Sequence, residues 1–162
     1  MTASRIDKPL LGWREWVALP ELGIEATKAK VDTGAKTCAL HAHFVEHFQR
    51  DDTAWVRFGM HPLANDTDYS VTCEAPLADR RQVRDSGGHT ELRSTIKTPV
   101  VIGGQSFEVE ITLTDRDSMR FRMLLGRNLL NGRFLIDPQL SYLAGRIEAL
   151  PESPIIKKNG LE

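Results

Sequence analysis

One late segment carries the regular alternation that most restricts the fold. Between residues 107 and 113, apolar side chains occupy every second position, and Glu or Thr fills the positions between them. A period of two puts the apolar side chains on one face of a β-strand and the polar ones on the other. Residues 100–102 are also apolar, and Gly103 and Gly104 follow them, as a tight turn with positive φ requires. The pattern predicts a β-hairpin and a fold built on half-buried strands.

Short apolar segments separated by Gly and Pro extend this pattern over the rest of the chain. We expect strands at residues 13–19, 26–31, 54–60, 70–74, 121–125 and 134–136, and a short helix at 127–131. Residues 39–48 fit a strand or a short helix, and we favour a strand for the first half. The sequence therefore predicts an all-β barrel or sandwich with one short helix near the C-terminus. A chain of 162 residues is about one domain, which we place at residues 1–150, followed by a flexible tail at 151–162.

The composition excludes several classes of protein. Lys and Arg total 21 and Asp and Glu total 22, so the formal net charge is -1, which argues against a nucleic-acid partner. Two cysteines, Cys38 and Cys73, are too few for a disulfide scaffold and fit a reducing compartment. No apolar run approaches the ~18 residues of a membrane span, and residues 1–11 contain no apolar stretch of a signal peptide. We therefore expect a soluble cytoplasmic protein without a membrane partner.

Two segments carry the residues of a candidate site. The first is Val31-Asp32-Thr33-Gly34-Ala35, which follows a predicted strand. A carboxylate at the end of a strand can be held rigidly at a cleft, and a glycine beside it lets the backbone approach closely. An ordinary Asp-Thr-Gly turn is the alternative, because short motifs are weak evidence by themselves. The second segment, residues 123–130, is an apolar strand, a glycine and a short helix.

The two segments, in this order and with the hairpin between them, resemble the retropepsin-like aspartic proteases over roughly residues 27–137. Residues 30–42, 83–88, 91–93 and 113–116 look like the bacterial branch named for ATP-dependent zinc proteases and also called RimB-like. Members of that branch are often found with an ATP-grasp glutamate ligase that modifies a ribosomal protein. Cys38 stands where the branch usually has Ser. The resemblance implies a closed acid-protease barrel, and the long spacer between residues 40 and 84 is expected to add strands or a lip to its cleft.

The resemblance also implies an aspartic endopeptidase that works as a homodimer. Its chemistry needs two facing carboxylates that share one proton, and the chain contains a single Asp-Thr-Gly. Asp32 of each protomer would activate water to hydrolyse a peptide bond, in a glutamate-rich chain or an isopeptide. We expect the catalytic set to be Asp32, Thr33 and Gly34. For substrate binding we expect Ala35, Lys36, Ser86, Gly87, Gly88 and Arg93, with residues 84–89 as a flap, and for dimer support Arg127 and Asn128.

Two alternatives stay open. A zinc-dependent peptidase would use Cys38, His41 and His43, although the chain has no His-Glu-x-x-His and no Cys-x-x-Cys. His43 and His47 have the i, i+4 spacing of a helix, but Glu46 does not directly follow the first histidine as that motif requires. The other alternative is a dimer of the same fold that binds a peptide strand without cutting it. We expect no cofactor, because the chain also lacks a phosphate-binding loop for ATP.

A basic stretch late in the chain has two interpretations. It contains Arg116, Arg120, Arg122, Arg127 and Arg133, interrupted by two aspartates. Arginines bind carboxylates through paired hydrogen bonds, so the stretch could hold an acidic substrate. The simpler interpretation is a solvated face of the protein.

Overall fold

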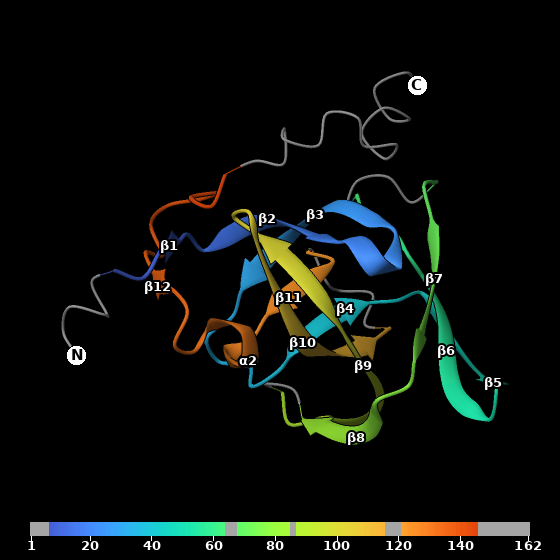
Figure 1. The fold of residues 1–162 in the computed structure, drawn as a ribbon. Helices are drawn as coiled ribbons and strands as arrows, with labels where there is room; N and C mark the ends of the chain where they lie inside the picture. The colour runs from blue at the N-terminus through green and yellow to red at the C-terminus, as the bar shows by residue number, and fades with distance from the viewer. Residues whose placement is uncertain (1–6, 64–67, 85–86, 116–120, 146–162) are drawn as a thin grey trace.

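The computed structural model describes residues 7–63, 68–84, 87–115 and 121–145 (Figure 1). Strands dominate this part of the chain, and the elements are short and closely spaced. In order they are β1 (Leu10–Leu11), β2 (Arg14–Leu19), the 3-10 turn η1 (Pro20–Leu22), β3 (Ile24–Val31), β4 (Cys38–His41), β5 (Phe44–Arg50), β6 (Thr53–Met60), β7 (Val71–Pro76), β8 (Asp79–Arg84), β9 (Thr90–Ile102), β10 (Gln105–Thr114), β11 (Met123–Leu125), α2 (Arg127–Leu130) and β12 (Leu135–Ile136).

The largest sheet brings distant parts of the sequence together. Its strand order is β10-β4-β11-β3-β2-β9-β8, and β9 also pairs with β10. The β9–β10 pair is the predicted hairpin, and Gly103 and Gly104 have the positive φ values of 60° and 79° that its tight turn needs. Strand β11 lies parallel to β3 with Leu125 opposite Val31, so the ends of the two candidate segments meet in this sheet.

A second sheet is formed by the spacer, as expected. Strands β5, β6 and β7 pair antiparallel in that order and form a separate layer in Figure 1. Their alternation puts one set of side chains into the common core, among them Val56, Phe58, Met60 and Cys73. The short strands β1 and β12 pair parallel to each other, near the two ends of the described chain.

These elements confirm an all-β fold with one short helix near the C-terminus. Residues 39–48 form strands in both halves, β4 and β5, so the helical spacing of His43 and His47 does not correspond to a helix. Strand β8 was not predicted. The tail at residues 151–162 lies outside the described residues. Among the described residues, no helix has the length and apolar character needed to cross a bilayer.

Candidate functional site

The loop between β3 and β4, residues 32–37, holds Asp32 in a defined orientation. The backbone N–H of Asp32 donates a hydrogen bond to the Leu125 carbonyl at 3.0 Å, which continues the β3–β11 pairing by one residue. The N–H of Gly34 donates to Asp32 Oδ1 at 3.0 Å, and the N–H of Ala35 donates to the Asp32 carbonyl at 3.1 Å. Asp32 is partly buried, whereas Thr33 and Gly34 are exposed. The loop therefore presents a fixed carboxylate at the protein surface.

Helix α2 supports this loop from behind. The backbone N–H groups of Arg127 and Asn128 donate to the carbonyls of Ala35 and Lys36 at 2.8 and 3.1 Å. The Arg127 guanidinium also donates to the Thr33 carbonyl at 3.0 Å. These bonds saturate the first N–H groups of the helix, which an isolated helix leaves unpaired. The two segments singled out from the sequence are thus one structural unit.

The Asn128 side chain connects two strands, β4 and β10, to that unit. Its amide oxygen accepts a hydrogen bond from the Cys38 N–H at 3.0 Å, and its amide nitrogen donates to the Glu110 carbonyl at 2.8 Å. Arg127 and Asn128 were expected to support a dimer. Within the chain, both support the Asp32 loop.

Gly126 lets the helix approach the loop closely. A Cβ atom at this position would lie 2.6 Å from the carbonyl carbon of Thr37 and 2.7 Å from its oxygen, distances that real side chains do not reach. The Gly126 N–H also contacts Cys38 Sγ at 3.4 Å. Any larger residue at this position would push α2 away from the loop.

The expected flap is the tip of a β-hairpin. Strands β8 and β9 pair antiparallel from Asp79–Thr95 to Arg84–Thr90, so residues 85–89 connect them. Gly87 and Gly88 are exposed, and Ser86 lies outside the described residues. Figure 1 shows β8 and α2 on the same lower side of the molecule. The hairpin is therefore on the side that carries the helix supporting Asp32.

Arg93 does not extend into solvent. Its side chain is 8% exposed, and its guanidinium forms an ion pair with Glu91 at 2.8 Å. A second nitrogen donates to the Thr112 hydroxyl at 3.4 Å, and that hydroxyl donates to the Cys38 carbonyl at 3.3 Å. This side chain, expected to bind substrate, has its contacts inside the chain and connects β9 with the start of β4.

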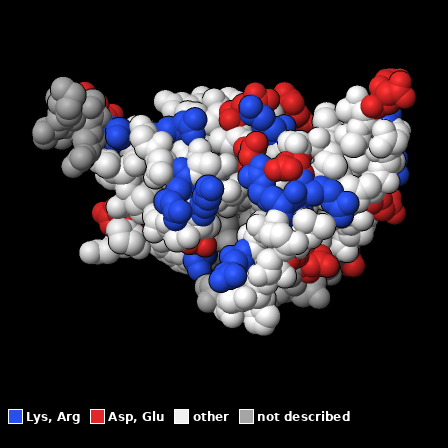
Figure 2. Space-filling model, turned by 90° about the horizontal axis from the view of Figure 1, so that it is seen from below, with Lys and Arg blue, Asp and Glu red and all other residues white. Residues whose placement is uncertain are grey.

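Basic side chains gather on the face that carries β8 and α2. Figure 2 shows Lys and Arg across the middle of this face, with acidic side chains among them. Arg81 accounts for part of this mixture, because it contacts Glu110 at 2.9 Å and Asp79 at 3.1 Å. In the late basic stretch, Arg127 and Arg133 donate to backbone carbonyls, and Arg116 and Arg120 lie outside the described residues.

The three residues of the zinc alternative, Cys38, His41 and His43, differ in their surroundings. Cys38 is fully buried, and burial raises the pKa of its thiol to about 11, so it stays protonated near neutral pH. His41 is also buried, whereas His43 is exposed and stacks on His61 at 4.3 Å between ring centroids. Within the described ranges, no three His, Cys, Asp or Glu residues are grouped so that they could hold a metal ion.

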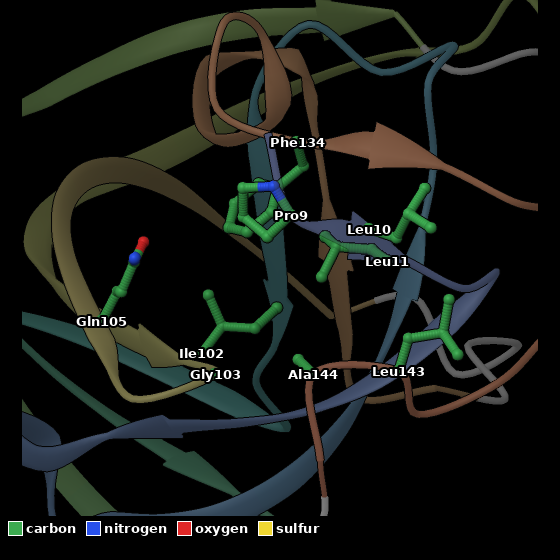
Figure 3. Close-up of a pocket in the computed structure, with 9 residues that line it drawn as sticks. All are labelled: Pro9, Leu10, Leu11, Ile102, Gly103, Gln105, Phe134, Leu143 and Ala144. Atoms are coloured by element: carbon green, nitrogen blue, oxygen red, sulfur yellow. The ribbon is translucent and has the colours of Figure 1, made fainter. Parts of the chain in front are cut away.

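An apolar pocket of about 440 Å³ lies away from the Asp32 loop. Figure 3 shows the residues that line it, which are Pro9, Leu10, Leu11, Ile102, Gly103, Gln105, Phe134, Leu143 and Ala144. None of them belongs to the Asp32 loop, to α2 or to the tip of the β8–β9 hairpin. The pocket is therefore separate from the candidate site.

Comparisons with known proteins show similarity in fold and in sequence. A protein of unknown function from Legionella pneumophila has a similar fold, with a TM-score of 0.68 over 84% of this chain and 98% of that one, at 20% identity. A probable alpha-L-glutamate ligase from Desulfotalea psychrophila is 44% identical over 88% of this chain, and one from Parasynechococcus marenigrum is 43% identical over 95%. The chain spans only 31% and 34% of the lengths of these relatives. A family model described as RimB-like, retropepsin-like aspartic endopeptidase RimB, matches residues 10–147, and the chain therefore belongs to the RimB-like family.

Proposed function

We propose that the protein is an aspartic peptidase that acts as a homodimer. The observation that carries this proposal is the Asp32 loop, in which a partly buried carboxylate is oriented by the Gly34 N–H and supported by α2. The description of the family as aspartic endopeptidases supports the same activity. A single Asp-Thr-Gly in the chain makes a second copy necessary, because the chemistry needs two carboxylates.

The reaction follows from two Asp32 side chains that face each other. Like charges at short distance cannot both ionise, so the pair holds one proton. The ionised carboxylate takes a proton from water, which attacks the peptide carbonyl, while the protonated carboxyl gives its proton to the carbonyl oxygen. The gem-diol formed in this way collapses to a carboxylic acid as the C–N bond breaks. The dyad gives a proton to the leaving amine nitrogen and takes one back from the gem-diol hydroxyl, so the pair again holds one proton. Thr33, which is exposed next to Asp32, contacts the second protomer. The two carboxyl groups titrate as a pair and not as separate groups.

The proposal includes a retropepsin-like barrel as the fold of the chain. Strand pairing runs from β10 through β4, β11, β3 and β2 to β9, and β9 pairs again with β10. This return pairing supports a barrel, which would leave fewer strand edges exposed, and β8 continues the sheet beyond β9. We therefore place the chain in a retropepsin-like barrel, with the β8–β9 hairpin as the flap over the cleft.

The substrate we propose is a polypeptide rich in glutamate or joined by an isopeptide bond. Support comes from the relatives, which are named probable alpha-L-glutamate ligases and contain a region 40–44% identical to this chain. A glutamate ligase would accordingly be the functional partner of this protein.

Replacement of the catalytic carboxylate tests the activity. Asp32→Asn should lower the cleavage rate of a peptide ending in several glutamates by about a hundred-fold or more, because it removes the general base. Asp52→Asn is the matched control, since Asp52 is exposed in the β5–β6 turn and its φ of 64° suits asparagine. Cleavage that survives Asp32→Asn contradicts the proposal, and its loss on adding a chelator would indicate a zinc peptidase instead.

A further inference from the structure

Three cationic side chains lie on the face of β2 and β3 that leads to Asp32. Side chains two residues apart in a strand share a face, so Lys28 and Lys30 share a face of β3. Asp32 follows the strand, continues its pairing with Leu125 and has the next position in this series. Arg14 of β2 is directly opposite Lys30, and Trp16 is directly opposite Lys28. Directly opposite residues in an antiparallel pair also share a face. The three cations are therefore neighbours on the approach to Asp32.

Among the described residues, these cations have no acidic partner of the kind found elsewhere. Arg50, Arg57, Arg81 and Arg93 each form an ion pair with a carboxylate. No ion pair within the described part of the chain includes the three cations of the β2–β3 face. Like charges directly opposite in a sheet are destabilising, so this arrangement costs stability in the free protein. A ligand with negative charge would relieve that cost.

Aromatic rings hold two of the cations in place. The Arg14 guanidinium lies 4.6 Å from the ring centroid of Trp13 and 5.1 Å from that of Tyr142, and its Nε donates to Ser141. Lys28 Nζ lies 5.4 Å from the Trp16 ring centroid. Cation–π contacts of this kind restrain the side chains before a ligand arrives. A restrained guanidinium loses little freedom when it binds a carboxylate.

We propose that Arg14, Lys28 and Lys30 form the subsite that selects carboxylate side chains of the substrate near the cleaved bond. This inference rests on the proposed peptidase function. Arg14 offers the planar donor pair that fits a carboxylate, and the two lysines add point charges along the strand. The acidic specificity is thereby assigned to the β2–β3 face next to Asp32, and not to the late basic stretch.

Binding to an inactive protein tests the subsite without relying on cleavage. In the Asp32→Asn background, octaglutamate should bind more tightly than octaglutamine, as measured by calorimetry or fluorescence anisotropy at low salt. Lys30→Gln should weaken octaglutamate binding about two- to five-fold, as expected for one exposed ion pair. The double variant Arg14→Gln, Lys30→Gln should weaken it about ten-fold or more, because the bidentate contact is also lost. Octaglutamine binding should stay within about two-fold, since an uncharged peptide forms no ion pair with these cations.

Lys97→Gln is the matched control, because it removes the same charge from an exposed position on β9. An equal loss of octaglutamate binding in this control, or unchanged binding in the double variant, would overturn the subsite. Wild-type cleavage without any preference for glutamate would overturn it too, while leaving the peptidase proposal standing. The reverse result, selective binding that depends on Arg14 and Lys30 with no cleavage of any peptide, would contradict the peptidase proposal alone.

Discussion

The buried carboxylate of Glu15 connects two distant parts of the backbone, near residue 12 and residues 143–144. Its carboxylate is fully buried and accepts hydrogen bonds from three backbone N–H groups, those of Gly12 at 2.6 Å, Leu143 at 3.0 Å and Ala144 at 3.1 Å. Glu15→Ala would leave three N–H groups without an acceptor. The hydrogen bond from Gly12 is buried, and those from Leu143 and Ala144 are partly buried. A buried unsatisfied group costs about 1–3 kcal/mol, so the variant should lose about 1–3 kcal/mol of its free energy of unfolding. Urea unfolding followed by fluorescence measures this loss.

Two comparison variants make that result specific. Glu15→Gln keeps one oxygen acceptor but turns the other position into a donor, so its loss should also be substantial. Glu21→Ala removes an exposed glutamate from η1 and should change stability by less than about 0.5 kcal/mol. If Glu15→Ala unfolds at the same urea concentration as Glu21→Ala, the carboxylate does not hold residues 143 and 144 as described.

The role of a single residue can be predicted from the sequence when its partners lie in the same short motif, and not when they lie far along the chain. The Asp32 loop and the Gly126-Arg127-Asn128 segment are recognisable as motifs, and the structure brings them together. Glu15 gives no such signal, because its partners Leu143 and Ala144 lie 128 and 129 positions along the chain. Arg93 was expected at the cleft because residues 91–93 resemble the family branch. Its contact with Thr112, by contrast, depends on the β9–β10 register, and Glu91 two residues earlier on β9 completes its ion pair.

At the scale of elements, two stacked histidines join the second sheet to the main one. His43 lies between β4 and β5, His61 directly follows β6, and their rings stack with an interplanar angle of 11°. Although His43 is exposed overall, the neighbours on one side of its ring partly desolvate the charged form and lower its pKa, and the nearby His61 and Arg122 lower it further. The folded state therefore favours the neutral ring. This contribution to stability is present above the ordinary value of 6.5 and is lost as the pH falls through the lower pKa of the folded state.

The urea midpoint of the wild type should therefore decline as the pH is lowered below about 6.5. His43→Gln should show a smaller decline, because glutamine carries no charge at any of these pH values and can still reach the Ser70 hydroxyl. His89→Gln is the control, since His89 is exposed next to the β8–β9 tip. Equal pH dependence of the wild type and His43→Gln would show that the stacked pair does not cause the decline.

Elements were predictable where one face of a strand is buried. Strand β10 alternates cleanly and was found, whereas β8 consists of Asp79–Arg84, which is charged or polar at five of its six positions. An edge strand exposed on both faces leaves no hydrophobic period to detect. Residues 43–47 show the opposite problem, because a short segment with His at both ends fits two periods, and only the pairing of β5 with β6 decides between them.

At the scale of the whole molecule, the pattern of short strands is enough for the all-β class and for the extra strands of the spacer. That pattern does not predict the order of strands in the main sheet. Strands β4 and β11 lie between β10 and β3 through parallel pairings between distant segments. Such pairings depend on contacts that local periodicity does not encode. The motif resemblance singled out the Asp32 segment and the α2 segment, and only the pairing of β3 with β11 shows that they meet.

The proposed mechanism puts two Asp32 residues in one site, so activity should depend on both protomers, and subunit mixing measures this directly. Wild type and Asp32→Asn would be unfolded together in different proportions, refolded, and checked by native mass spectrometry for random pairing. Only pairs with two wild-type chains carry a complete dyad, so activity should follow the square of the wild-type fraction, falling to about one quarter in an equal mixture. A chain that works alone would retain about one half, because its activity is linear in that fraction. A linear dependence, with dimers present, would show that the dimer is not the catalytic unit and would contradict a dyad shared between chains.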